Sequence, residues 1–599
     1  MPQPPVIGQR WAWLPAPGTW RYYALLASIG ILLLGPLGGV AAAYMNFSLG
    51  FFVGGQTLAG ILGSLVTVGY GSAGKHGANY MQTTAASVAG MAGLAVTVQA
   101  FAWLGLPQPP AWHLVAYLTC IGMFGVGVGM LYTPLLVDRM RLTFPSGLAV
   151  ANILRALTDP LLLRRSVATL GGGIAAGIAC GVATARVAWL GAIEFSAATF
   201  GAGMIVGARI GLAALTGGAA SWAAAPYFVS IGWLEPTDPA RKITFLIALG
   251  MILGAAVLDV STILLQAWLR LRAPPRPAAA PLAAWRLVDT RRILAWIAVW
   301  GVAVLATGTG FFDAPLPYLL FALALVFVFA LVNGIAMGIS DSNPISSAFV
   351  VTVVLLAALG LREPAVGMIV AAVLLVSTSV ACDMQQDRST GARLGTDRRI
   401  QFRFQAGGVL AGALLAVFLA QFFMAAYPVL RLDQTVLPAD QQPAEWASAM
   451  TYKFVGALRG VTEDKPYQRT AIWIGVGIGL ATAVARLLLK ESAAYKRFAA
   501  GSRTGAATDF LVDSVLLPSP YASSFGGFVS VPTVAWFAAG GVAASAAEAF
   551  AARRRRAAPS DLPEDMSATS LVGGGLLAGD ALAALGIGAA GLARAMAGR

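Results

Sequence analysis

The amino-acid sequence predicts an all-α polytopic membrane protein of about 15 to 17 transmembrane helices, a number that includes short or re-entrant segments. Hydrophobic residues make up 58% of its 599 residues, whereas charged residues make up only 11%. The mean hydropathy is +0.75. Because a soluble domain carries roughly 25% charged residues to cover its surface, this composition excludes a large soluble enzyme, a disordered chain and a disulfide-bonded scaffold.

Apolar runs long enough to cross a bilayer, about 20 residues each, occur from one end of the chain to the other. Two more polar segments, 143–157 and 494–517, predict half-helices or re-entrant pieces buried in protein. Closely spaced glycines at 122–129, 171–177 and 475–479 predict helix faces that approach one another closely. We predict full spans at 22–46, 48–70, 79–104, 113–137, 167–190, 195–222, 243–270, 291–312, 316–339, 344–361, 364–382, 403–427, 469–490, 525–548 and 568–596.

The formal net charge of +14 comes from basic residues that lie between the spans and not in one patch. Basic residues gather at 139–141, 270–292, 388–403 and 553–556. Short loops rich in Lys and Arg are typical of the cytoplasmic side of a membrane. We therefore expect a cytoplasmic N-terminus and an extracytoplasmic loop at 428–468. The charge predicts orientation in the lipid bilayer, and we expect no nucleic-acid partner.

A basic segment rich in Pro and Ala at 271–290 divides the chain into two parts of similar length. We predict an N-terminal transmembrane half at 1–270 and a C-terminal half at 291–599. A short internal similarity, NYMQTTA from Asn79 and NPISSAF from Asn343, is consistent with two related halves.

The residues of metal and covalent chemistry are scarce in this chain. There are three cysteines, none in a CxxC pair, and only two histidines, so we expect no metal site, no cofactor and no catalytic residue. The stretch from Gly69 to His76, GYGSAGKH, is close to a phosphate-binding loop, but His76 stands where Ser or Thr must hold magnesium. Since neither HExxH nor GxSxG occurs, a membrane-embedded enzyme is a less favoured alternative. A passive channel is a second, less favoured alternative.

Polar residues interrupt the apolar runs at four places, and such residues are costly in hydrocarbon unless they have a use. At 76–90, amide and hydroxyl groups open a span, where they either hold a polar solute or cap the helix and bond to neighbouring helices. At 142–157, Pro and Gly break the backbone, which indicates either a cavity-facing broken helix or an ordinary interfacial helix start. The candidate substrate-binding residues in these two segments are Asn79, Gln82, Thr83, Ser146, Asn152 and Arg155.

The other two interruptions lie in the second half, at 331–349 and 377–399. Asn333, Asn343 and Asp383 are the candidate substrate-binding residues there, and the alternative for Asp383 is a solvated loop paired with nearby arginines. We expect Arg155 and Arg209 to meet a substrate carboxylate. Acidic residues in or beside the spans carry protons or form structural ion pairs, and the candidates for proton coupling are Glu194, Asp259, Asp341, Asp387 and Asp580.

Five stretches of the chain resemble, in the same order, segments of the oligopeptide transporter superfamily. They are GANYMQTTAASVAG from Gly77, LTFPSGLAVANILRAL from Leu142, GAGMIVGARIGLAALTGGAASW from Gly201, CDMQQDRSTG from Cys382 and SLVGGGLLAGDALAAL from Ser570. Ala78 replaces the glutamate that the family pattern has before Asn79, which puts a proton or cation role at that position in doubt. The asparagine-proline-glycine and lysine-isoleucine-proline-proline-arginine signatures are absent, so the chain looks closer to the bacterial and yellow-stripe-like branch.

The resemblance implies a secondary active importer, coupled to protons, in a bacterial inner membrane. It implies small peptides as substrates, with metal complexes of siderophore- or nicotianamine-like chelators as the alternative. The expected partners are this substrate, protons and the lipid bilayer, and a homo-oligomer is left open.

Overall fold

The computed structural model consists of helices throughout the part of the chain that it describes, which confirms the all-α membrane fold class. Within that part, 13 helices are long and apolar enough to cross a membrane. The described residues are 14–50, 55–142, 144–157, 159–187, 189–190, 193–272, 285, 288–340, 345–443, 446–462, 466–554 and 567–597.

The helices alternate with short 3₁₀ or π-helical segments, which carry the symbol η. The first part of the chain forms α1 (Trp20–Ile29), η1 (Gly30–Leu34), α2 (Gly35–Ser48), α3 (Gly55–Thr67), η2 (Val68–Ala73), α4 (Gly74–Gly93), α5 (Val96–Trp103), α6 (Ala111–Thr133), η3 (Pro134–Arg139), α7 (Pro145–Ala156), α8 (Pro160–Arg186), α10 (Ala197–Ser230) and α11 (Arg241–Arg272). The second part forms α12 (Thr290–Phe312), α13 (Leu316–Ser340), α14 (Ile345–Ala358), α15 (Pro364–Leu394), α16 (Arg398–Ala426), η5 (Pro428–Arg431), η6 (Ala439–Gln441), α17 (Ala449–Thr462), α18 (Pro466–Glu491), α19 (Ala493–Gly501), α20 (Arg503–Leu511), η7 (Val512–Leu516), α21 (Pro520–Phe528), α22 (Val531–Arg554) and α23 (Ala568–Ala597).

Short side chains and backbone turns set several of the helix ends. Asp159, Asp289 and Asp397 each accept a hydrogen bond from a backbone N–H in the first turn of the helix that follows. Such caps satisfy N–H groups that have no partner inside the helix. At Gly71 the backbone has φ +60°, and this turn separates α3 from α4.

The short predicted segments are shorter than a membrane span, as expected. Helix α7 has 12 residues, and α19 and α20 have nine each. The prediction that 494–517 is buried in protein is wrong for these two helices, because no residue of α19 and only Gly505 of α20 is buried. The predicted span 344–361 differs, because α14 has only 14 residues, about 21 Å at 1.5 Å per residue. The end predicted near residue 382 also differs, since α15 continues to Leu394.

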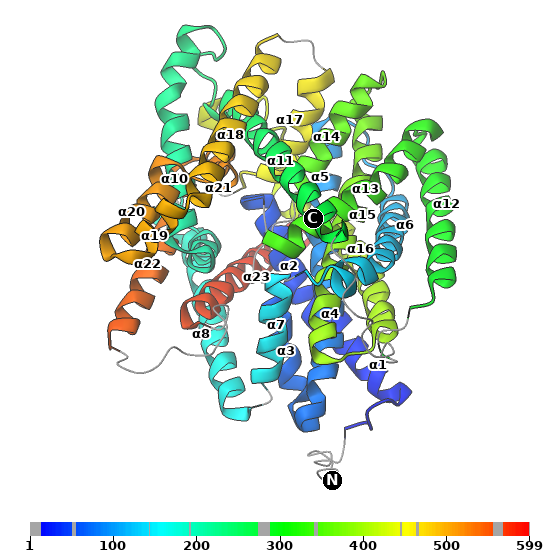
Figure 1. Ribbon diagram of the computed structural model, residues 1–599. Coiled ribbons are helices and arrows are strands. Elements are labelled where there is room, and N and C mark those ends of the chain that lie inside the picture. Colours follow the sequence, from blue (N-terminus) through cyan, green and yellow to red (C-terminus); the bar gives the residue numbers. More distant parts are fainter. Residues whose placement is uncertain are drawn as a thin grey trace.

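The core of the molecule surrounds α15, which packs against α6, α13 and α4, while α4 packs against α2 and α16. In the most apolar 18-residue stretch of α15, 94% of the residues are buried, whereas in that of α12 only 22% are buried. In Figure 1, α12 accordingly lies at the right-hand edge of the molecule, beside α6. A polar side chain on α15 is therefore surrounded by protein, not by lipid.

Glycines allow several helix pairs to touch backbone to backbone. A Cβ atom on Gly177 of α8 would lie 2.4 Å from the carbonyl oxygen of Leu576 in α23. A Cβ atom on Gly475 of α18 would lie 2.1 Å from the carbonyl oxygen of Ile247 in α11. Since such distances exclude any larger residue, the predicted close approaches at 171–177 and 475–479 are confirmed.

Helices from the two predicted halves interleave. The pairs α8–α23, α10–α22 and α11–α18 each join a first-half helix to a second-half helix. Most of the predicted linker 271–290 lies outside the described residues. The division into two related halves stays a prediction.

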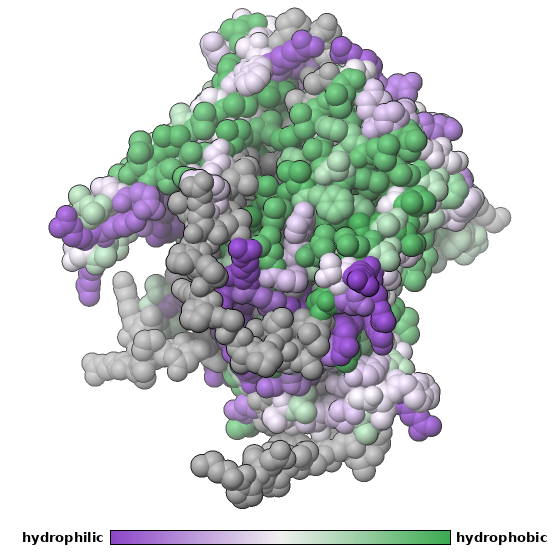
Figure 2. Space-filling model, turned by 45° about the vertical axis from the view of Figure 1, so that its right-hand side comes forward, coloured by the Kyte–Doolittle hydropathy of each residue, from purple (hydrophilic) through white to green (hydrophobic). Residues whose placement is uncertain are grey.

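Apolar side chains form a broad band on the face shown in Figure 2, with hydrophilic side chains above and below it. Val299 and Val302 of α12 are 64% and 65% exposed. Contiguous exposed apolar surface of this kind is unfavourable in water and favourable in lipid. The molecule is a multi-pass membrane protein.

Candidate functional site

Helices α4, α15 and α16 bring together polar side chains that are far apart in the sequence. Asn79, Gln82 and Thr83 lie within about one helical turn of one another on α4, and all three are fully buried. Helix α16 comes close to this part of α4 at Gly408, where glycine has no side chain. A Cβ at this position would lie 2.6 Å from the carbonyl oxygen of Thr84. The first predicted cluster thus faces α16 and α15 in the protein interior.

A chain of amide hydrogen bonds links the three helices. The amide of Asn79 donates to Gln82 at 3.1 Å, and the amide of Gln82 donates to the Asp387 carboxylate at 2.7 Å. From α16, the amide of Gln401 donates to the side-chain oxygen of Asn79 at 2.8 Å and to the backbone oxygen of Asp387 at 3.2 Å. Two predicted clusters, at 76–90 and 377–399, therefore meet in one network.

Asp387 is fully buried, and its Oδ1 accepts from Gln82 while its Oδ2 has no hydrogen-bond partner among the described residues. Asp383 lies four residues earlier on α15, on the same face. A Cβ on Gly90 of α4 would lie 2.9 Å from Asp383 Oδ2, so this glycine leaves room for the carboxyl group. Both acids lie inside a helix, and the solvated loop considered as the alternative for 377–399 is not what forms there.

Sequence reasoning missed several members of this site. Arg388 is fully buried, and its Nη2 lies 3.4 Å from the side-chain oxygen of Gln405 on α16. Arg398 is 1% exposed and donates to both carboxylate oxygens of Asp138, at 2.6 and 2.7 Å. Gln401 and Gln405 of α16 are two further members that the sequence analysis does not name. Their i, i+4 spacing, which places both amides on one face of the helix, is the signal by which they could have been found.

Helix α7 lies beside this network. The hydroxyl of Thr390 donates to the backbone oxygen of Gly147 at 3.0 Å, and a Cβ on Gly147 would lie 2.9 Å from the backbone oxygen of Gln386. Ser146 and Asn152 are half-buried on α7. Arg155 is exposed and donates to the backbone oxygen of Arg393 at the end of α15. The broken helix predicted at 142–157 therefore packs against α15.

Asn333 lies on α13 and is 1% exposed, and its Nδ2 has no partner in the part of the chain that the structure describes. Its neighbour Gly334 faces Gln385 of α15, a fully buried amide whose oxygen and nitrogen also have no partner there. Asn343 and Asp341 lie outside the described residues.

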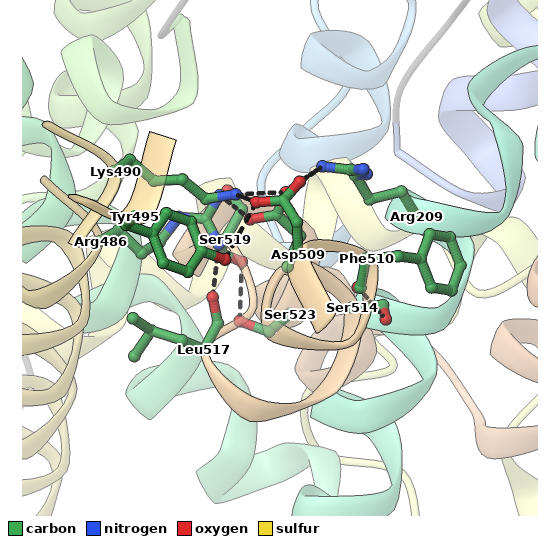
Figure 3. Close-up of polar contacts among 11 residues, drawn as sticks. Arg209, Arg486, Lys490, Tyr495, Asp509, Phe510, Ser514, Leu517, Ser519 and Ser523 are labelled. Carbon is green, nitrogen blue, oxygen red and sulfur yellow. Dashed lines mark hydrogen bonds and ion pairs between the residues drawn. The ribbon is translucent and has the colours of Figure 1, made fainter. Parts of the chain in front are cut away.

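Arg209 belongs to a different cluster, shown in Figure 3. It reaches Asp509 of α20 from one side at 3.0 Å, and Lys490 of α18 reaches the same carboxylate from the other side. Asp513 of η7 pairs with Arg209, with Lys490 at 3.0 Å and with Arg486 at 3.0 Å. Arg209 thus already has carboxylate partners from the protein itself.

The remaining acidic candidates also join helices to one another. Asp580 of α23 accepts from the backbone N–H of Ala198 at 2.8 Å and from the Ser196 hydroxyl at 3.1 Å, at the start of α10. Asp259 accepts from the Tyr521 hydroxyl at 2.7 Å. Glu194 accepts from the Ser530 hydroxyl at 2.8 Å. Among the described residues, none of these four hydrogen bonds connects to the network around Asp387.

A family model described as OPT oligopeptide transporter protein matches residues 19–590. The chain belongs to the OPT oligopeptide transporter family. Members of this family are transporters and not enzymes, so this OPT protein is a membrane transporter of oligopeptides or related solutes. No curated protein matches the chain. Among the described residues of this OPT chain, no group of three or more His, Cys, Asp or Glu side chains could hold a metal ion.

Proposed function

We propose that the protein imports small peptides across the cytoplasmic membrane together with protons. The observation that supports this proposal is the buried network of α4, α15 and α16 around the carboxyl group of Asp387, with Asp383 half-buried about one helical turn earlier on α15. The network includes residues from both predicted halves of the chain, since Gln82 and Asp387 are 305 positions apart. A movement of one set of helices against the other would therefore change the surroundings of these acids.

The chemistry of the two acids suits proton-coupled transport of a peptide. A carboxylate oxygen inside the membrane needs a compensating positive charge. Because Asp383 and Asp387 are two carboxyl groups about one helical turn apart, one can carry a proton while the other binds the terminal ammonium group of a peptide. Neutral amides such as Asn79 and Gln401 can hold peptide groups through hydrogen bonds without the desolvation cost of a fixed charge. Binding of proton and peptide at one site couples the two movements.

Uptake of labelled tri- and tetra-alanine into proteoliposomes, with and without an imposed pH gradient, tests this function. We expect accumulation against the peptide gradient only when the outside is acidic. The variants Asp387→Asn and Asp383→Asn should lower gradient-driven accumulation at least about tenfold, the equivalent of roughly 1.4 kcal/mol. Glu491→Gln removes an exposed carboxylate from a surface ion pair with Lys496 and serves as the matched control.

Three outcomes would contradict the proposal. Accumulation by both aspartate variants at the wild-type rate would exclude their role in coupling. Uptake that only equilibrates the peptide, whatever the pH gradient, would indicate a passive channel. Accumulation of a labelled metal–chelator complex in place of every peptide tested would assign the alternative substrate class.

A further inference from the structure

Arg388 is a buried cation whose hydrogen bonds are mostly unfilled. Its side chain is fully buried on α15, and its one hydrogen bond within the described residues is the 3.4 Å contact with Gln405. Its Nε and Nη1 atoms have no partner in the same part of the chain. A guanidinium group keeps its charge at all physiological pH values, and burial without an anion is costly.

The neighbouring Arg398 shows how a buried arginine is satisfied in this protein. It lies ten positions further on and is 1% exposed, and Asp138 accepts two hydrogen bonds from it at 2.6 and 2.7 Å. Among the described residues, Arg388 has no comparable partner. Asp387 and Asp397 attract it electrostatically, but neither forms an ion pair or a hydrogen bond with it among the described residues.

Gln405 adds a third donor beside Arg388. Its side-chain oxygen accepts from Arg388, while its Nε2 is buried and has no partner in the described chain. Among the described residues, the Nε–H and Nη1–H₂ groups of the guanidinium and the amide N–H₂ of Gln405 are therefore without an acceptor. A carboxylate presents two oxygens with about four acceptor positions, and arginine binds this group through paired hydrogen bonds.

We propose that Arg388 and Gln405 form the subsite for a carboxylate of the transported substrate, the terminal carboxylate of a peptide or a carboxylate of a chelator. The inference rests on the proposed transport function and refines it. Asp387, the adjacent residue, has an unpartnered oxygen among the described residues that suits an ammonium group. The site therefore offers opposite charges to a substrate that carries both.

The test compares tetra-alanine as the free acid with tetra-alanine amide, first as competitors of labelled peptide uptake and then as ligands in thermal unfolding of the purified protein. In the wild type we expect the free acid to compete at least about tenfold better than the amide. In Arg388→Gln the two should compete within about twofold of each other. Arg399→Gln, which removes a 63%-exposed guanidinium paired with Asp397, should keep the wild-type ratio.

Two further variants keep the test informative if Arg388→Gln does not fold. Arg388→Lys retains the charge without the paired geometry and should lose part of the preference. Gln405→Ala leaves the guanidinium in place and should also lose part of it. Unchanged acid-to-amide ratios in these variants would overturn the subsite, and so would equal competition by both ligands in the wild type.

The two measurements separate this inference from the proposed function. If the free acid stabilises the wild type but not Arg388→Gln, and yet no peptide or chelate is transported, the subsite stands and the transport proposal fails. If peptides accumulate with no preference for the free acid, transport stands and the subsite fails. Stabilisation by acetate or phosphate equal to that by the peptide acid would indicate a general anion site and overturn the assignment.

Discussion

Gln82 supplies the hydrogen bond that holds the Asp387 side chain to α4, at 2.7 Å. Both groups are fully buried, so water does not replace the bond when it is lost. A buried charged or polar group without a partner costs about 1–3 kcal/mol. The position of the carboxylate therefore depends on an amide 305 positions away in the sequence.

We expect Gln82→Leu to lower the free energy of unfolding by about 2 kcal/mol, because Asp387 Oδ1 loses its donor. Denaturant titration of the protein in detergent measures this value. Ser87→Ala is the control, since the hydrogen bond that Ser87 donates among the described residues stays within α4, to the backbone oxygen of Thr83. Equal stability of the two variants would show that Gln82 does not hold the carboxylate.

At the scale of elements, glycine contacts set how closely helices cross. On α18, a Cβ at position 479 would lie 2.1 Å from the backbone oxygen of Met251 in α11. At position 477 of the same helix a Cβ would meet no atom within 4 Å. The two glycines therefore differ in their surroundings and not in their sequence context.

Gly479→Ala should lower the free energy of unfolding by about 1–3 kcal/mol, because backbone atoms cannot move aside and the helices must separate. Gly477→Ala should leave stability unchanged or raise it slightly, since alanine favours the helix. Thermal unfolding of both variants in the same detergent measures the difference. A larger loss from Gly477→Ala than from Gly479→Ala would contradict the packing of α11 on α18.

The ion cluster of Figure 3 connects α20 to α10 and α18, and its effect on stability depends on pH. The hydrogen bond from Lys490, together with those from Arg209 and Tyr495, lowers the pKa of Asp509 to about 2. The ordinary pKa of an aspartate is about 3.9. A lowered pKa means that Asp509 contributes stability above pH 4, and that this contribution disappears as the pH falls from about 4 to about 2.

Asp509→Asn should therefore be less stable than the wild type at pH 6, and the difference should shrink as the pH falls below 4. Unfolding midpoints measured at several pH values between 6 and 3 check this. Because the cluster is partly exposed, high salt should also reduce the difference at pH 6. A difference that stays constant at all pH values would show that Asp509 is not held by its cations.

At the scale of the whole molecule, orientation follows from the distribution of basic loops. We expect residue 502, beside the basic segments of α18 and α19, on the cytoplasmic side, and residue 440 on the opposite side. Both residues are exposed. In a variant in which Cys120, Cys180 and Cys382 are alanine, Asp440→Cys should react with a membrane-impermeant thiol reagent in intact cells.

Ser502→Cys should react with the same reagent only after the membrane is permeabilised. Labelling of both positions from outside, or the reverse pattern, would contradict the predicted topology.

Local patterns were sufficient to predict part of the site. Asn79, Gln82 and Asp387 lie where polar residues begin or end an apolar run, and that change is visible in the sequence. The sequence predicts Arg388 only as one of the arginines of a solvated loop, because a segment in which apolar residues give way to charges does not show that α15 continues to Leu394. Arg209 is a single charged residue within an apolar run of the sequence. It pairs with Asp509 and Asp513, and only the packing of the helices reveals these partners.

The sequence by itself determined the membrane fold class, most of the spans and the positions of the polar interruptions, because each depends on residues close together along the chain. Tertiary structure decided which interruptions meet: those of α4 and α15 form one network with α16, while Arg209 lies in another cluster. The reason is physical. Hydropathy depends on each residue and its neighbours, whereas a hydrogen bond across 305 positions depends on how helices cross, and that is decided by glycine contacts and side-chain shape.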